Sequence, residues 1–263
     1  MAQRSTDTDT DMDAGEGRPA TTGARGTRQR DEARSQAVLA TAGVLLVLAV
    51  GMMLRHSAAD QVVTAAFAAH DSGVLGTLAV GVYTAIQPLT AIGITVAAAV
   101  LVATCTDLRE GFAFGTAVAL AWLPVWLVKA AVDRPRPEVG SFAQRLGDPS
   151  YPSGHTAFIA VLAVALILET TGTRLQTVTR VVGPVVVVLV IGAVLVLGVH
   201  FPTDIAASLV WAATVTPLAW TAGRAAARSL PLREPGGPRG PAGRVAPDAA
   251  YTGRGVRRAS DRP

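Results

Sequence analysis

The chain has 263 residues, of which half are hydrophobic and only 16% are charged, and its formal net charge is +4. The charged residues crowd into the two ends and a few short connections, which leaves long uncharged stretches between them. This composition excludes an ordinary soluble globular protein, gives no reason to expect a nucleic-acid partner, and predicts an integral membrane protein.

The predicted elements begin after a polar leader. Residues 1–36 mix arginines with acids and hold almost no large apolar side chains, so we expect them to be disordered. Six apolar stretches follow, most of them near the ~20 residues that cross ~30 Å of hydrocarbon, and the first predicts an uncleaved signal-anchor. The fold class we predict is therefore all-α, a bundle of six transmembrane helices over 37–223. The stretches lie at about 37–54, 86–105, 111–128, 156–168, 181–199 and 205–223.

The connections and the C-terminal end carry weaker patterns. Apolar side chains recur at helical spacing over 62–70, which predicts a short helix at the membrane surface. A continuous helix over 76–105 would be ~45 Å long, so we predict a break at Gln87–Pro88. Residues 224–263 are rich in glycine, proline and arginine and are predicted to be a disordered basic tail.

Arginines in the short connections predict the orientation. They precede the first span, separate the second from the third and the fourth from the fifth, and follow the sixth. Because such residues favour the cytoplasm, we expect both termini there and a multi-pass protein of the plasma membrane. Arg134 and Arg136 break this rule on the outer side, and binding an anionic group there would explain why they are kept. The outer connections are then 55–85, 134–154 and the turn at His200.

A first cluster of candidate residues follows the third span. Lys129 is the sole lysine beside 22 arginines, and six residues separate it from Arg136–Pro137. Pro135 and Pro137 would hold the arginine in an extended loop. An ammonium and a guanidinium that converge are suited to gripping a phosphoryl group. Taken alone, the pair is better explained as a snorkelling lysine and interfacial arginines.

Two further clusters stand at the outer starts of later spans. Ser153 can cap the fourth span, Gly154 lets backbone amides approach an anion, and His155 falls in the first turn. His200 precedes the sixth span, and Asp204, one helical turn further on, could orient its imidazole. Two histidines at outward helix starts, each with a plausible partner, favour chemistry over a structural role.

The three clusters together resemble the type 2 phosphatidic acid phosphatase superfamily, which includes bacterial acid phosphatases and vanadium haloperoxidases. The resemblance covers about residues 37–223 and implies an active site at the extracytoplasmic face. It rests on Lys129 with six residues to Arg136–Pro137, on Pro152-Ser153-Gly154-His155, and on His200 with three residues to Asp204.

The resemblance also implies a role for each residue. His200 would attack phosphorus to form a phosphohistidine, Asp204 would steady it, and His155 would protonate the leaving oxygen. Neither a metal nor a cofactor is needed in such a scheme. The non-bridging phosphate oxygens would be held by Lys129, Arg136, the Ser153 hydroxyl and the Gly154 amide.

One departure from the family pattern concerns its third motif. The family usually has Ser-Arg seven and six residues before the nucleophilic histidine, where this chain has Ala193–Val194. A phosphate-binding arginine is therefore missing. We hypothesise that Arg134 supplies the lost charge; the alternative is that it pairs only with Asp133 or with lipid headgroups.

Three functions from different classes fit these residues. The one we favour is a phosphatase for a lipid phosphate or diphosphate whose tail stays in the bilayer. The second is a catalytically impaired relative that binds phospholipid or polyprenyl phosphate, for which Val194 is the main support. The third is a transporter or channel, against which the clustering of polar groups at one face argues. The sequence identifies neither the lipid, among phosphatidic acid, phosphatidylglycerol phosphate and undecaprenyl diphosphate, nor the oligomeric state.

Overall fold

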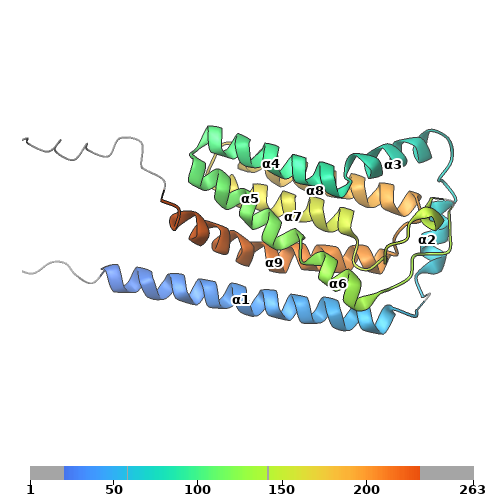
Figure 1. The fold of residues 1–263 in the computed structure, drawn as a ribbon, viewed down its shortest axis with the longest axis horizontal. Helices are drawn as coiled ribbons and strands as arrows, with labels where there is room; N and C mark the ends of the chain where they lie inside the picture. The colour runs from blue at the N-terminus through green and yellow to red at the C-terminus, as the bar shows by residue number, and fades with distance from the viewer. Residues whose placement is uncertain (1–20, 58, 141, 232–263) are drawn as a thin grey trace, which may run out of the picture. The chain divides into compact units, whose positions relative to one another are not determined.

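The computed structural model describes residues 21–57, 59–140 and 142–231, and within these ranges it contains helices and no strand (Figure 1). The expected disordered segments at 1–20 and 232–263 lie outside the described residues. The helices are α1 (Thr21–Leu54), α2 (Gln61–Ala68), α3 (Gly73–Ala85), α4 (Pro88–Cys105), α5 (Leu108–Trp122), α6 (Val125–Val132), the 3-10 turn η1 (Ala143–Arg145), α7 (Gly154–Glu169), α8 (Gln176–Val196) and α9 (Pro202–Arg228).

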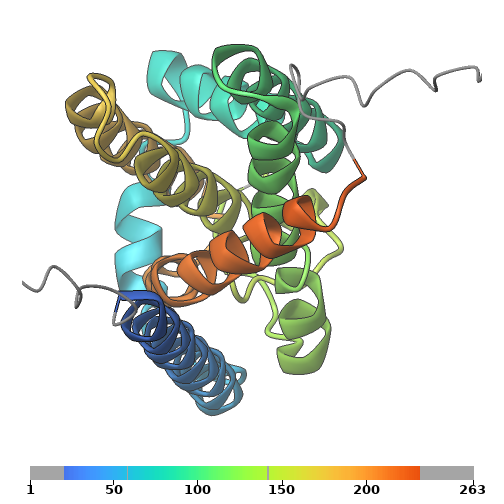
Figure 2. The same ribbon diagram turned by 90° about the vertical axis from the view of Figure 1, so that its left-hand side faces the viewer.

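Helix α9 is central to the bundle, where it packs against α1, α5 and α7 (Figure 2). The contact with α5 is close because small residues face each other. Ala113 and Ala117 of α5 are fully buried, and a Cβ atom added to Gly223 of α9 would lie 2.5 Å from the Ala113 oxygen. Small residues allow apolar helices to approach each other closely. Such packing matters within lipid, because the hydrophobic effect does not favour association of helices there.

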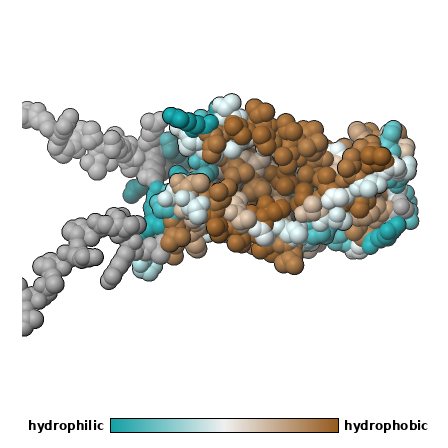
Figure 3. Space-filling view, turned by 90° about the horizontal axis from the view of Figure 1, so that it is seen from above, coloured by the Kyte–Doolittle hydropathy of each residue, from teal (hydrophilic) through white to brown (hydrophobic). Residues whose placement is uncertain are grey.

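The surface of the helices is apolar over a broad band. Figure 3 shows hydrophobic residues across the middle of one face, with hydrophilic residues gathered toward its two ends. Among the described helices, five are long and apolar enough to cross a membrane, and the number rises to six if the pair α2 and α3, bent by 113°, is one span. The five are 30–54, 88–105, 108–132, 176–196 and 202–228.

The helix predicted as the fourth span is the one that differs. Helix α7 has 16 residues, too few to be counted with the five, and half of its side chains are buried while none is exposed. It therefore lies inside the bundle, where neighbouring helices rather than lipid surround it. The count of six spans stays a prediction, whereas the all-helical class agrees with the structure.

The helix breaks follow local sequence. Helix α3 ends at Ala85 and α4 begins at Pro88, which confirms the break predicted at Gln87–Pro88. Helix α2 occupies the segment predicted as a short helix. By contrast, α1 begins at Thr21, so helix extends into the leader that we expected to be disordered up to residue 36. Alanine, arginine, glutamine and glutamate favour helix, and a helix already nucleated by an apolar run propagates through them at little cost.

Candidate active site

The three sequence clusters come together where α6 ends and where α7 and α9 begin. Helix α6 stops at Asp133, whose φ of 51° is left-handed, and an extended loop then carries Arg136. The start of α7 is capped by the Ser153 hydroxyl, which accepts from the backbone N–H of Thr156, as predicted. The start of α7 is tied to α9 by Ser208, whose hydroxyl donates to the Ser153 carbonyl (2.9 Å).

These segments enclose a cavity of about 150 Å³. Five of the residues proposed from sequence line it, together with aromatic and polar side chains from the break between α3 and α4 and from α5 and α6. The lining residues are Tyr83, Ile86, Gln87, Pro88, Trp122, Trp126, Lys129, Arg136, Leu146, Asp148, Gly154, His155 and His200.

The two cations of the cavity share one carboxylate. Lys129, which is only 3% exposed, donates to Asp148 Oδ2 (3.1 Å) and to the Pro149 carbonyl. Arg136 donates through Nη2 to Asp148 Oδ1 (2.7 Å) and through Nη1 to the carbonyl of Val199 (2.7 Å). Although partial burial raises the pKa of Asp148, the charges of Lys129 and Arg136 outweigh it and lower that pKa to about 2. Asp148 is therefore an anion that bridges both cations.

His200 lies against the carboxylate of Asp204. Its Nδ1 is 3.5 Å from Asp204 Oδ2, which is within ion-pair distance, but the two atoms do not form a hydrogen bond in this structure. Burial of the ring, followed by the nearby charges of Arg136 and Lys129, holds the pKa of His200 well below its ordinary value. The imidazole is therefore neutral near pH 7, and a neutral imidazole has the lone pair that a nucleophile requires.

His155 is held by aromatic neighbours. Its ring stacks on Tyr83 with centroids 4.0 Å apart, and its Nε2 lies 3.2 Å from the Tyr83 carbonyl oxygen. Trp122 donates from its indole N–H to the Gly154 carbonyl (3.3 Å), which fixes the turn before His155. A Cβ atom added to Gly154 would lie 3.7 Å from Lys129 Cε, so this turn faces the lysine across the cavity.

Two residues proposed from sequence to bind phosphate do not line the cavity, and the position of the missing arginine is buried elsewhere. Arg134 is fully buried, donates to Asp204 and Asp60, and does not line the cavity. The Ser153 hydroxyl bonds to Thr156 within the helix cap and does not line the cavity. Val194, at the position of the missing arginine, is fully buried in α8.

The chain was compared with known proteins. The model of the PAP2 superfamily matches residues 110–228, a range that includes all three clusters. Residues 110–228 belong to the PAP2 superfamily. This confirms the resemblance to the type 2 phosphatidic acid phosphatases drawn from the motifs.

One solved structure is similar to this PAP2 protein. It is the crystal structure of the first transmembrane PAP2 type phosphatidylglycerolphosphate phosphatase from Bacillus subtilis, which has 18% sequence identity and a TM-score of 0.57. The alignment covers 74% of this chain and 98% of that chain, and at this identity it concerns the fold. No curated protein sequence matches.

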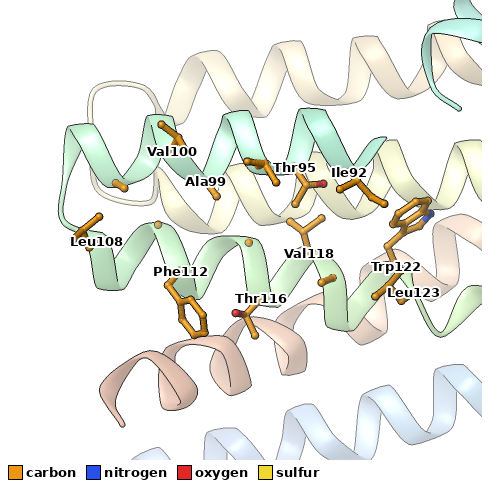
Figure 4. A pocket seen from close by; sticks show the side chains of 15 residues that line it. Ile92, Thr95, Ala99, Val100, Leu108, Phe112, Thr116, Val118, Trp122 and Leu123 are labelled. Atoms are coloured by element: carbon orange, nitrogen blue, oxygen red, sulfur yellow. The ribbon is translucent and has the colours of Figure 1, made fainter. Parts of the chain in front are cut away.

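A second hollow of this PAP2 protein, about 630 Å³ in volume, runs between α4 and α5 (Figure 4). Ile92 and Thr95 of α4 face Val118 and Trp122 of α5 across it. Its lining is almost entirely apolar, and Trp122 lines both this groove and the smaller cavity. An apolar groove therefore adjoins the polar cavity at one shared side chain.

Sequence reasoning missed several residues of the site. Asp148 was not among the candidates, although its place five residues before Ser153, in a loop with unexpected arginines, is a usable signal. Tyr83 and Trp122 carry no signal of their own in the sequence. They contact the start of α7 across separations of 72 and 32 residues, which spacing alone does not reveal.

Proposed function

We propose that this PAP2 protein is a membrane phosphatase that removes phosphate from a lipid phosphate or diphosphate, of the phosphatidic acid, phosphatidylglycerol phosphate or undecaprenyl diphosphate type. The observation that carries the proposal is the cavity in which both histidines meet both cations and the Gly154 turn. A site for one tetrahedral dianion next to a nucleophile and an acid is suited to phosphoryl transfer.

The proposed reaction has two steps. In the first, His200 Nε2 attacks phosphorus, the N–P bond forms, the bond from phosphorus to the lipid oxygen breaks, and that oxygen takes a proton from protonated His155. In the second, water attacks phosphorus, His155 receives its proton, the N–P bond breaks, and inorganic phosphate leaves. Asp204 keeps the Nδ1 proton of His200 in place and stabilises the positive charge on the ring.

Fixed cations and an amide would stabilise the phosphoryl oxygens. Lys129 supplies a compact charge, Arg136 a planar fork and Gly154 a backbone N–H at the positive end of α7. These groups are held before substrate binds, so they need little rearrangement in the transition state. We propose that no metal takes part, and we assign Ser153 to capping α7 rather than to binding phosphate.

The lipid tail would lie in the groove between α4 and α5. The groove is apolar, and Trp122 connects it to the cavity, so a lipid could place its phosphate beside the histidines without withdrawing its tail from apolar surroundings.

The proposed orientation follows from the arginines of the connections. With both termini in the cytoplasm, the cavity opens at the extracytoplasmic face of the plasma membrane. The proposed phosphatase domain is 37–223, flanked by the leader 1–36 and the tail 224–263. This topology can be tested by introducing a cysteine at Gln144 or at Arg174 and treating intact cells with a membrane-impermeant thiol reagent. The cysteine at position 144 should be labelled, and the one at position 174 should be labelled only after the cells are opened.

The deciding experiment measures phosphate release by the purified protein from a panel of lipid phosphates, with chelator present. Release by the wild type that is lost in His200→Ala supports the phosphatase, and the preferred lipid defines the substrate. An intact fold of His200→Ala, measured by thermal unfolding, is the necessary control. Release that stops when chelator is added would contradict the metal-free scheme.

The tail site has its own test. Ala119 lines the groove, whereas Leu120, the next residue, does not line it and is 48% exposed. Ala119→Phe should raise KM for a long-chain lipid phosphate and leave a short-chain, water-soluble phosphate ester unaffected. Leu120→Phe adds a ring on another face of the same helix and should change neither. Equal effects of Ala119→Phe on both substrates would contradict the assignment.

A second candidate function rests on Val194. Because a fully buried valine stands where the superfamily usually has arginine, the site lacks one cation. A protein that binds lipid phosphate but does not cleave it would have this deficit. Binding of vanadate or inorganic phosphate without release of phosphate from any lipid would favour this function over the first.

A further inference from the structure

Arg134 is a fully buried guanidinium held between two carboxylates. Its Nη1 donates to Asp204 Oδ1 (2.8 Å), and its Nη2 donates to Asp60 Oδ1 (3.0 Å). The other contacts are the Thr203 hydroxyl, the Ser57 carbonyl, and the ring of Phe201, whose centroid lies 3.9 Å from Cζ. A charge removed from water is costly unless it is paired and hydrogen-bonded, and this one has both kinds of partner.

Asp60 joins the connection between α1 and α2 to the start of α9. Its Oδ2 accepts from the backbone N–H of Thr203 (3.1 Å) and from the Thr203 hydroxyl (2.5 Å). Although burial raises the pKa of Asp60, the Thr203 hydrogen bonds and the charge of Arg134 lower it below its usual value. Asp60 is therefore ionised, and it fixes both Arg134 and the first turn of α9.

The two oxygens of Asp204 have different partners. Oδ1 accepts from Arg134, while Oδ2 accepts from the backbone N–H of Phe201 (2.9 Å) and faces His200 Nδ1 at 3.5 Å. Turning the plane of this carboxylate away from its present orientation would break the bonds to Arg134 and to the Phe201 N–H. The guanidinium thus helps to fix the orientation in which the carboxylate faces the imidazole.

We propose that Arg134 and Asp60 are a positioning pair: they hold the Asp204 carboxylate in the rotation that orients His200, and neither touches the substrate. Asp60 lies outside residues 110–228, so the segment before the matched region completes the site. The inference rests on the proposed phosphatase function for its kinetic test, but its effect on His200 is measurable without turnover.

The kinetic test uses Asp60→Asn, which keeps the shape and removes the charge. We expect kcat to fall about 10- to 100-fold, as for a modest misplacement of a reacting group, with KM and vanadate inhibition within twofold of wild type. Asp133→Asn is the matched control, because Asp133 neighbours Arg134 in sequence, is exposed, and has a left-handed φ that asparagine also adopts. It should behave as wild type.

A double substitution separates positioning from general damage. If Asp60 acts through Asp204, then Asp60→Asn should cost little more in kcat once Asp204→Asn is present, since residues that act as a unit are not additive. Effects that multiply would overturn the proposal. A wild-type kcat in Asp60→Asn, or a change in KM and vanadate inhibition alone, would overturn it as well.

The turnover-independent test is the tautomer of His200. In protein labelled with ¹⁵N-histidine, solid-state NMR should show His200 protonated at Nδ1 in the wild type and a mixture of tautomers in Asp60→Asn, with the signal assigned by His200→Ala. If no lipid phosphate is cleaved but the tautomer responds to Asp60→Asn, the proposed function fails and the positioning pair stands. An unchanged tautomer in Asp60→Asn overturns the pair, whatever the activity.

Discussion

Replacing Asp148 with asparagine is expected to tighten the binding of inorganic phosphate and vanadate. The carboxylate bridges Lys129 at 3.1 Å and Arg136 at 2.7 Å, the two cations proposed to hold the substrate phosphate. A dianion entering the cavity must displace this carboxylate or bind beside a like charge. Asp148→Asn removes the competing charge and leaves a side chain of almost the same size.

The size of this effect can be worked out from the pKa of Asp148. Lowering it from 3.8 to about 2 corresponds to a net ~2.5 kcal/mol in favour of the charged carboxylate, which is the attraction to the cations less the cost of burial. The side chain is 40% exposed, so solvent screening reduces this to about 1 kcal/mol, or roughly fivefold in an inhibition constant. Because the pKa is so low, the carboxylate stays charged above about pH 4, and its charge should not change between pH 5 and 8.

The assay is inhibition of lipid phosphate hydrolysis by inorganic phosphate and by vanadate, compared between wild type and Asp148→Asn. Glu138→Gln is the control, because Glu138 is an exposed carboxylate on the same loop that does not itself line the cavity. It should leave the inhibition constants of phosphate and vanadate unchanged. Weaker inhibition in Asp148→Asn would mean that the carboxylate mainly holds Lys129 and Arg136 in place. Unchanged inhibition would mean that the two cations do not bind phosphate.

Further predictions concern stability. The folded-state pKa of His200 lies below its ordinary value of 6.5, so the unfolded chain binds an extra proton below pH 6.5, and the free energy of unfolding should fall there by up to ~1.4 kcal/mol per pH unit. Thermal unfolding in detergent should show this loss in wild type and less of it in His200→Gln; equal losses would contradict the assigned shift. Gly223→Ala should destabilise by about 1–3 kcal/mol, because its Cβ would lie 2.5 Å from the Ala113 oxygen. Gly192→Ala meets nothing within 4 Å and should be neutral or stabilising by up to about 1 kcal/mol, so a similar loss in both variants would refute the packing argument.

The helices were predictable because each apolar run has its own local signal. The break before Pro88 and the cap at Ser153 follow from the chemistry of those residues, and both are present. The start of α1 was not predicted, since helix propagation beyond an apolar run leaves no sharp mark in sequence. Helix α7 was recognised, but its position inside the bundle depends on which helices surround it.

The site was predictable where short-range motifs carried it. The convergence of Lys129, Arg136, His155 and His200 on one cavity agrees with their expected positions at helix ends. The partner of Arg134 was not predictable, because Asp60 lies 74 positions away and the choice between carboxylates depends on tertiary packing. Asp133, the partner suggested by sequence proximity, is instead the left-handed residue that ends α6.

The short length of α7 has a consequence for the depth in the membrane at which a phosphate would meet the proposed site. Its 16 residues rise ~24 Å, less than the ~30 Å of hydrocarbon, and the start of α7 lies inside the level that α2 and α3 reach (Figure 1). Under the proposed function, a lipid headgroup that reaches His155 would lie deeper than its resting position and would lose part of its hydration. We therefore expect that reconstitution into bilayers of different thickness alters turnover without any change in the residues of the cavity.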